Sequence, residues 1–515
     1  MKFGTLMRSL VMTAMVFAGC DINNPADNVK VLFNEDPLTM IAVEIVDARS
    51  TEQIAAPDSV RLVIEGSSRH LVTDATEKSR TSFASVSGYF TIAIAAEAVI
   101  SPESPLEITL KASAPDYIAA SKPLTIVSES GLSVIMTLVK RSNPPEGITS
   151  TTVREGDVDD SGVVDAPVSY SSESDPETGA SSTVSIESGT VIRDETGTPL
   201  TGELTASVTY FNVQSSNTID AIPGGLVTTV RTTDATTNSV LVPAGMVSLD
   251  IVDASGHSAS TFDTPVGVSF QIPPDVVNPA TGAAVVPGET IPVWRYDDDR
   301  SDWLFIADGA VSGPETNGNY TVTFSVDHFS YYLAAWMDTT STVCDSGTTI
   351  TLTGGYSAVD MLVKKVSDGT YYSSYRTSVD IADPVVRLAT VPVNVPVLVE
   401  AWYGAQKVGS VAVDNLCGAE VTLPVTIPGK KVTFSVDVYD AADPTQRMRP
   451  SRAIYIGEND TRKYVGYMKD GHITIYGLTE GVEYMFWVFH EDMWYSDVYV
   501  IGPESLVELE FAVET

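Results

Sequence analysis

The sequence predicts an all-β protein, organised as a string of about four antiparallel β-sandwich domains behind an N-terminal signal segment. Short runs rich in Val, Ile, Thr and Tyr, many of them alternating apolar and polar residues, recur along the 515 residues. Turn-forming residues separate these runs, among them 36 glycines and 29 prolines. Only residues 95–99 have a helical pattern, and so short a segment does not indicate the alternating strands and helices of a parallel sheet.

The charge of the chain excludes several classes of partner. Acidic residues number 67 and basic residues 30, which gives a formal net charge of −37. Nucleic-acid phosphates are bound by clustered Lys and Arg, so we expect no nucleic-acid partner. The same excess of acid disfavours adsorption to anionic lipid. A hydrophobic content of 43% excludes wholesale disorder.

The first twenty residues have the pattern of a secretory signal. Lys2 and Arg8 precede the apolar run Leu10–Phe17, which is too short to span a bilayer as a mature helix. Two small residues and Cys20 follow, and this arrangement resembles the signal motif of bacterial lipoproteins. The alternative is a buried cysteine in an N-terminal helix, which Pro25 and its polar neighbours disfavour because they cannot continue a helix.

The lipoprotein resemblance implies a lipid anchor and a location. In that family the cysteine thiol receives a diacylglycerol and the chain is cut in front of it. Residues 1–19 are then a signal peptide, Cys20 is lipidated, and residues 20–35 form a tether. Through this lipid, the membrane is an expected partner of the protein. The expected location is the bacterial cell envelope, at the outer membrane or cell surface rather than the inner membrane. Asp21 resembles an inner-membrane retention signal of enteric bacteria and leaves the choice of membrane open.

Four β-rich blocks follow the tether. The first, residues 36–141, contains strand-like runs at 41–46, 59–64, 88–94, 106–111 and 133–139. An Asn, Pro and Gly breaker at 142–147 opens a Ser-, Thr- and Asp-rich stretch, so residues 142–180 are expected to be a polar, acidic linker. The remaining blocks are 181–337, 338–428 and 429–515. The last block ends in a strand at 507–513 that alternates apolar and acidic residues, which indicates one buried and one solvated face.

The second block carries a recognisable pattern, formed by Pro292, Trp294, Tyr296 and Asp297, an acidic turn, Trp303, and the closing triplet His328, Phe329 and Ser330. It resembles a module of bacterial envelope lipoproteins and of animal cartilage-intermediate-layer-like ectodomains. The first block, with residues 88–90 and 114–117, resembles carboxypeptidase-regulatory-like sandwiches. Both resemblances imply Ig-like, non-catalytic interaction or structural modules with no catalytic residues to carry over.

Cys344 and Cys417 are the two cysteines beyond Cys20, and each lies beside a turn-like stretch next to a strand. In an oxidising envelope the economical interpretation is one disulfide that closes the third block. The alternative is a pair of unpaired buried thiols.

Two acidic segments are candidate calcium sites. The first resembles the opening of an EF-hand or dockerin loop, with ligand positions at Asp157, Asp159, Ser161, the carbonyl of Val163, and Asp165. Its twelfth position is Val168 instead of a bidentate acid, which favours a plain acidic linker. The second segment offers Asp297, Asp299 and Ser301. A hairpin turn is the favoured alternative there, because Asp and Ser satisfy local backbone donors in turns without any metal. Calcium is the one cofactor that the sequence suggests.

Aromatic residues concentrate between 484 and 499, and Trp487, Trp494 and Tyr495 are the candidate ligand-binding residues. Exposed Trp and Tyr on a flat sheet can stack sugar rings, whereas alternate aromatics can equally fill the core of the last sandwich, which is the favoured alternative. The five histidines are scattered, and no hydrolase or metalloprotease motif occurs. We therefore expect a non-catalytic, lipid-anchored envelope protein that binds or scaffolds a protein or polysaccharide partner. The alternatives are a carbohydrate-binding surface lipoprotein and a polysaccharide-active enzyme.

Overall fold

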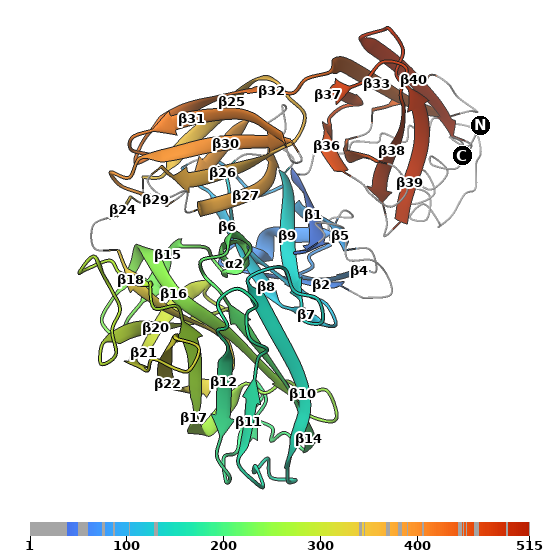
Figure 1. Ribbon diagram of the computed structural model, residues 1–515. Coiled ribbons are helices and arrows are strands. Elements are labelled where there is room, and N and C mark those ends of the chain that lie inside the picture. Colours follow the sequence, from blue (N-terminus) through green and yellow to red (C-terminus); the bar gives the residue numbers. More distant parts are fainter. Residues whose placement is uncertain are drawn as a thin grey trace, which may run out of the picture.

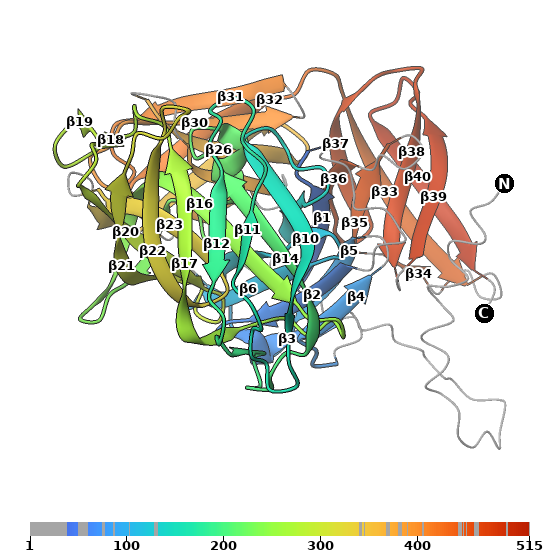
Figure 2. The same cartoon turned by 60° about the horizontal axis from the view of Figure 1, so that its bottom comes forward.

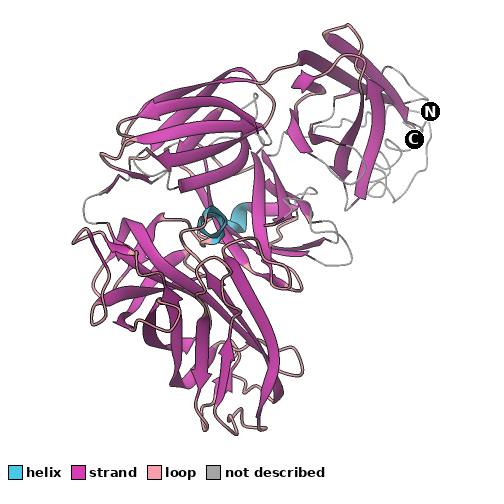
Figure 3. Ribbon diagram, in the orientation of Figure 1, coloured by secondary structure: helices cyan, strands magenta, loops and turns pink. Residues whose placement is uncertain are grey.

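The protein is described by a computed structural model (Figure 1). The described residues are 39–49, 60–74, 78–85, 88–101, 103–127, 132–338, 342–344, 346–366, 371–379, 384–388, 390–403, 406–440, 445, 447–449, 451–457, 463–490 and 493–513. Strands make up nearly all of their regular structure (Figure 3), beside the 3-10 turn η1 (Arg69–Leu71) and the short helix α2 (Ser216–Ala221). The all-β prediction is confirmed. None of the described helices is long and apolar enough to cross a membrane.

The first sandwich packs two sheets over one apolar core. Its strands are β1 (Thr39–Asp47), β2 (Val60–Glu65), β3 (Val72–Asp74), β4 (Ser82–Ser85), β5 (Tyr89–Ile94), β6 (Leu106–Ser113), β7 (Tyr117–Ile118), β8 (Ala120–Ile126) and β9 (Leu132–Lys140). The sheets have the orders β3-β5-β1-β9-β7 and β4-β2-β6-β8. Alternate residues such as Ile41, Val43, Leu62 and Ile108 point into the core, because side chains on a strand alternate between its faces.

The third sandwich repeats this strand order. Its strands are β24 (Val343–Cys344), β25 (Thr348–Gly355), β26 (Val359–Lys365), β27 (Tyr371–Val379), β28 (Val385–Leu388), β29 (Val391–Pro392), β30 (Val397–Tyr403), β31 (Gln406–Val413) and β32 (Glu420–Thr426). One sheet has the order β28-β25-β32, and the facing sheet has the order β27-β26-β30-β31. A disulfide joins Cys344 to Cys417, with 5.5 Å between their Cα atoms, so the predicted disulfide is confirmed.

The fourth sandwich has the same order again. Its strands are β33 (Lys430–Asp440), β34 (Arg447–Met448), β35 (Arg452–Ile456), β36 (Lys463–Met468), β37 (His472–Leu478), β38 (Glu483–His490), β39 (Met493–Val500) and β40 (Leu506–Val513). β33 lies between β37 and β40, and the second sheet has the order β36-β35-β38-β39. In all three sandwiches the first and last principal strands are parallel neighbours: β1 with β9, β25 with β32, and β33 with β40.

The second domain is built differently. Its strands are β10 (Ile148–Val158), β11 (Val168–Ser171), β12 (Ser182–Ile186), β13 (Ile192–Arg193), β14 (Gly202–Phe211), β15 (Val227–Arg231), β16 (Thr236–Val252), β17 (Thr261–Ile272), β18 (Val277–Asn278), β19 (Ala283–Ala284), β20 (Thr290–Asp297), β21 (Asp302–Ser312), β22 (Tyr320–His328) and β23 (Tyr331–Met337). Twelve of these strands form one sheet, with the main order β10-β14-β16-β23-β20-β21-β22-β17-β12-β11. Thr149 and Thr151 on β10 hydrogen-bond to the backbone of Glu173 just after β11, so the two ends of this sheet approach each other.

The predicted linker at 142–180 is wrong for the part that contains β10 and β11. β10 pairs with β14 over most of its length, and β11 pairs with β12, so both strands belong to the second domain. β10 could not be recognised from the sequence because this strand lies at the end of the sheet and has an exposed face made of Ser, Thr and charged residues. Few of its residues are apolar, so the alternation that marks a half-buried strand is weak.

The domains pack against one another instead of forming an extended string (Figures 1 and 2). Ile118 and Val139 of the first sandwich share an apolar cluster with Phe211 and Trp294 of the second domain. Val240 of the second domain lies in the core cluster of the third sandwich. Tyr89, Ala358 and Tyr455 bring together the first, third and fourth sandwiches, with the rings of Tyr89 and Tyr455 edge-on at 5.6 Å. The first sandwich therefore contacts all the other domains.

Candidate interaction site at the acidic turn

The acidic turn joins β20 to β21 as a tight hairpin, in which Asp297 pairs with Asp302. Ser301 has a φ of 55°, a left-handed conformation that a non-glycine residue adopts only where its surroundings impose it. The backbone N–H of Arg300 donates to the carbonyl of Asp297, which closes the turn. The local geometry of this segment is therefore that of a hairpin turn, the alternative that the sequence favoured.

Arg231, at the end of β15, holds the two carboxylates at the base of the turn. Its guanidinium lies 2.5 Å from Asp297 Oδ2, and its Nε lies 3.2 Å from Asp302 Oδ2. The Asp302 carboxylate is nearly buried, with 7% of its side chain exposed. The hydrogen bond that Arg231 donates to the Asp302 carboxylate is the main reason that the pKa of Arg231 is raised. The Arg231 guanidinium therefore already neutralises the carboxylates at the base of the turn, including the candidate calcium ligand Asp297.

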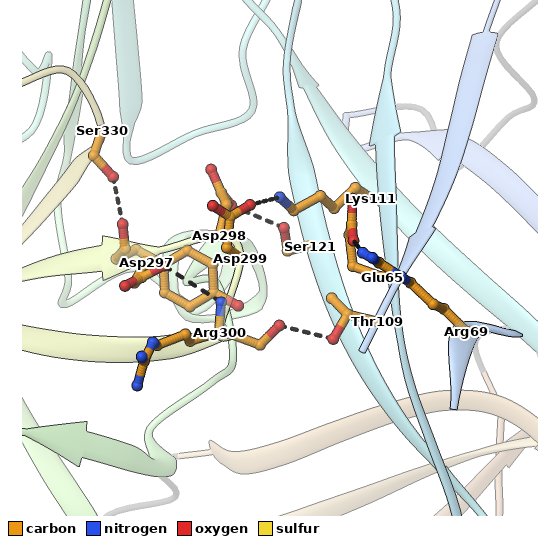
Figure 4. A network of polar contacts seen from close by, with 12 residues as sticks. Glu65, Arg69, Thr109, Lys111, Ser121, Asp297, Asp298, Asp299, Arg300 and Ser330 are labelled. Atoms are coloured by element: carbon orange, nitrogen blue, oxygen red, sulfur yellow. Dashed lines mark hydrogen bonds and ion pairs between the residues drawn. The ribbon is translucent and has the colours of Figure 1, made fainter. Parts of the chain in front are cut away.

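The tip of the turn docks onto the outer face of the first sandwich (Figure 4). Ser301 shares a hydrogen bond of 2.8 Å with Thr109 on β6. Lys111 Nζ lies 3.3 Å from Asp299 Oδ1, and the Ser121 hydroxyl of β8 donates to Asp298 Oδ1 over 3.0 Å. Thr109 and Lys111 alternate with core residues along β6, so they project from the face opposite the core. The turn is thus a contact between two domains.

Removal from water changes the acidity of groups at this contact. Asp298 is exposed to solvent, yet the protein atoms crowded around it raise the pKa of its carboxyl, against the opposing effect of Lys111. Burial also raises the pKa of Tyr331, and the charge of Asp298 raises it further. The Tyr331 hydroxyl donates to the carbonyl of Ala119, 2.5 Å away in the first sandwich. The pKa values of Asp298 and Tyr331, both in the second domain, therefore depend in part on contacts with the first sandwich.

The aromatic residues of the second-domain pattern are structural. Trp303 is completely buried and its indole N–H donates to the carbonyl of Pro223, while that of Trp294 donates to the carbonyl of Ala335. Ser330 of the closing triplet donates to the carbonyl of Tyr296 over 2.7 Å. His328 lies 2.6 Å from Asp327, its neighbour in the sequence. These contacts tie β20 to β23 and fasten β21 to the segment that precedes β15.

The first candidate calcium loop has the hydrogen bonding of a hairpin turn. Asp159 Oδ1 accepts from the backbone N–H groups of Ser161 and Val163, and the Val163 carbonyl accepts from the N–H of Asp159. Gly162, at a φ of 79°, supplies the left-handed residue that such a turn requires. One carboxylate oxygen and the one candidate carbonyl are therefore already engaged within the loop.

Two further loops of the same domain repeat this arrangement. Asp194 and Asp253 each accept from the N–H groups two and four residues further along the chain, as Asp159 does. Gly197 and Gly256 occupy the position of Gly162 with similar φ values of 82° and 84°. The pattern of Asp, Ser or Thr, and Gly is thus a recurrent way of closing hairpins in this domain. Among the described residues, no group of three or more His, Cys, Asp or Glu is arranged to hold a metal ion. Calcium binding stays a prediction.

The aromatic cluster of the fourth sandwich divides between two faces. Tyr484 and Phe486 pack against the core, and Phe486 lies edge-on to Phe434 at 5.2 Å. Trp487 points to the other face, where it is half-buried against Tyr89, Ala358 and Tyr455. Trp494 and Tyr495 are placed in β39, opposite Phe489 and Val488, but their side chains lie outside the described set. Ligand binding by Trp487, Trp494 and Tyr495 stays a prediction, as does lipidation of Cys20, which lies outside the described residues.

The partners of the acidic turn were not visible in the sequence. Thr109, Lys111, Ser121 and Arg231 are ordinary outward-facing strand residues, and no local pattern links them to a turn that follows far along the chain. A buried carboxylate in the third sandwich was missed for the same reason. Glu400 is 3% exposed and receives Lys364 at 2.8 Å, Lys407 at 3.1 Å and the indole N–H of Trp402 at 3.0 Å. The Glu and Lys spacing on adjacent strands is the one signal that hints at this group.

Comparisons with known proteins do not identify a family. No protein-family model matches the chain, and no curated protein matches it significantly, so the two module resemblances stay predictions. Among solved structures it is similar to the minor pilin of Streptococcus agalactiae at 11% identity, covering 32% of this chain and 94% of that one, with a TM-score of 0.14. The Bacillus anthracis TIE protein matches at 8% identity, over 90% and 69% of the two chains, with a TM-score of 0.14. The major pilin subunit BcpA of Bacillus cereus matches at 8%, over 93% and 99%, with a TM-score of 0.16.

Proposed function

We propose that this chain is a non-catalytic, lipid-anchored binding or scaffolding protein of the bacterial cell envelope. The observation that carries the proposal is that the carboxylates of the acidic turn are engaged in contacts within the second domain and with the first sandwich. Asp297 and Asp302 are held by Arg231, and Asp298 and Asp299 contact the first sandwich. Side chains fixed in this way set the relative positions of rigid β domains, which is what a scaffold requires.

The anchoring part of the proposal rests on Cys20 and on the redox state of the other cysteines. The Cys344–Cys417 disulfide is of the kind that persists in exported proteins and is rare in reducing compartments. Together with the signal segment, it supports export of the chain and attachment of a lipid to Cys20.

Metabolic labelling tests the anchor. The full chain is expressed with its own signal in a bacterium fed an alkyne-bearing fatty acid, and the label on the purified protein is measured. Wild type and the Cys417→Ser control should carry the label and partition with membranes. Cys20→Ser should lose both properties. Equal labelling of Cys20→Ser and wild type would contradict lipidation at this residue.

A further inference from the structure

The three sandwiches of common topology differ at one sheet edge, the one formed by β8, β31 and β39. In the first sandwich, β8 carries Lys122 and Pro123, and Lys122 Nζ donates to the carbonyl of Ile135 in β9, 3.1 Å away. In the third, Gly409 of β31 abuts the next sheet so closely that a Cβ there would lie 2.4 Å from the Pro424 carbonyl oxygen. Lysine, proline and contact with the next sheet are all ways to block strand addition.

The corresponding edge of the fourth sandwich has none of these protections. β39 contains no Lys, Arg or Pro, and β38 is its one strand partner among the described residues. It lies on the side of the molecule that faces away from the other domains (Figures 1 and 2). An exposed strand edge of this kind presents backbone donors and acceptors to another chain.

The outer face of this edge is apolar where a solvated sheet face is normally polar. Val498 and Val500 are 41% and 52% exposed, although Tyr499 between them packs on Phe434 in the core. Together with Val482, they account for three of the ten exposed large hydrophobic side chains in the described part of the chain. Trp487, opposite Ser496, continues this strip to the contact with Tyr89. The strip is therefore continuous with an existing domain interface.

The hydrogen-bonding direction of β39 leaves its outer backbone groups available. Ile501 donates inward to the carbonyl of Val482, and alternation along an antiparallel strand then turns the N–H groups of Val500 and Val498 outward. The N–H of Val498 is held by the adjacent Asp497 side chain over 2.7 Å. An incoming strand would exchange this local contact for a carbonyl of its own backbone.

Charge decides what kind of strand fits. Asp497 accepts from the outward N–H of Val498, and Glu504 accepts from the Tyr499 hydroxyl. Asp497 and Tyr499 alternate with Val498 and Val500 along β39, so these acids serve the face opposite the two valines. Opposite charges on neighbouring strands attract, whereas like charges placed opposite one another repel. A second copy of this chain would bring its own acids and a net charge of −37 to the same edge, so self-pairing is disfavoured.

We propose that β39 is a docking edge for an extended segment of a partner protein in which basic residues alternate with β-branched apolar residues. The partner segment adds as a further strand beside β39, with its backbone bonded to Ser496, Val498 and Val500. Its apolar side chains lie on the two valines, and its alternating basic side chains lie on the opposite face, at Asp497 and Glu504. This proposal rests on the proposed binding function and names the chemistry of the partner.

The test uses the full chain and a fluorescent peptide of alternating Val and Lys, blocked at both ends and as long as the eight residues of β39. Fluorescence anisotropy should show saturable binding. The double variant Val498→Lys and Val500→Lys should bind about tenfold more weakly or not at all. A peptide with Glu in place of Lys should not bind. A peptide N-methylated at alternate residues should also fail, because it keeps the charge and loses the backbone donors.

The matched control is Val277→Lys with Val286→Lys, which replaces two valines of similar exposure, 49% and 50%, in the second domain. This variant should bind like wild type, and all three proteins should melt alike. Absence of saturable binding, equal binding by the Val498 and Val500 variant, or equal binding of the N-methylated peptide would overturn the proposal. Self-association of wild type that the variant abolishes would also overturn it in favour of a second copy. None of these outcomes bears on lipidation, which depends on Cys20.

Discussion

The second domain and the third sandwich are both β structures, but different interactions stabilise them. The second domain buries large aromatic residues, including Trp294 and Trp303, and fastens each indole N–H to a backbone carbonyl. The core of the third sandwich consists mainly of smaller aliphatic residues, and a disulfide and a buried carboxylate supplement it. A small sandwich buries less apolar surface per residue than a large sheet does, so additional links matter more for it.

Trp303→Ala should destabilise the second domain strongly and gives the largest expected effect. The side chain is completely buried, so its loss removes apolar contacts and leaves the Pro223 carbonyl without the indole N–H donor. We expect the free energy of unfolding to fall by about 3–5 kcal/mol. Denaturant unfolding measures it, and Trp303→Phe should recover part of the loss. A change below about 1 kcal/mol would show that aromatic burial does not dominate this domain.

Removing the disulfide tests the third sandwich. The cysteines are 73 residues apart, and the chain-entropy model assigns such a loop about 4 kcal/mol of stabilisation. Cys344→Ser with Cys417→Ser should therefore unfold this sandwich at lower denaturant concentration, and the second domain should unfold as before. Backbone hydrogen exchange, resolved along the chain as denaturant is added, separates the two transitions. If the unfolding midpoints of both domains shift equally, the disulfide does not stabilise the third sandwich selectively.

Glu400→Gln should have a smaller effect and a characteristic pH dependence. Burial alone would raise the pKa of Glu400, but hydrogen bonds from Lys364, Lys407 and Trp402 outweigh burial and lower it. The charged form therefore stabilises the fold above the ordinary value of 4.5, and this contribution is lost as the pH falls through the lowered pKa. At neutral pH the substitution should cost about 2–3 kcal/mol because two lysines lose a buried partner. Melting curves across the acid range measure both effects, and Gln should remove the acid-side slope.

Asp298→Asn is expected to have the smallest effect, with the opposite sign. The raised pKa of Asp298 means that the folded state binds its proton more tightly than the unfolded state does. Its contribution to stability therefore decreases as the pH rises from 3.8 through the raised pKa. Asn keeps an acceptor for Ser121, so this variant should be slightly more stable than wild type at neutral pH and flatter with pH. A variant less stable than wild type at pH 7 would show that the charge attracts Lys111 more than crowding disfavours it.

Much of the architecture could be predicted from the sequence because strand alternation is a local signal. The disulfide and the hairpin alternative for Asp297–Asp302 were predicted on similarly local grounds. β10 was missed because its exposed face is polar, and the docking of the acidic turn was missed because Thr109 and Lys111 lie far away in the chain. The shared topology of three sandwiches was also hidden, since the strand order depends on pairing between distant segments rather than on any repeated residues.

The parallel pairing of first and last strands has a mechanical consequence. Because β1 runs parallel to β9, the chain enters the first sandwich at one pole and leaves it at the other, and the same holds for β25 with β32 and β33 with β40. Tension applied to the two ends of such a sandwich pulls the paired strands past each other in shear. The hydrogen bonds between them, which are evenly spaced in a parallel pair, then share the load at once instead of opening one by one. A chain tethered at its N-terminus and pulled by a partner at β39 would meet this resistance in the first and third sandwiches, whose first and last strands both lie between the two points of attachment.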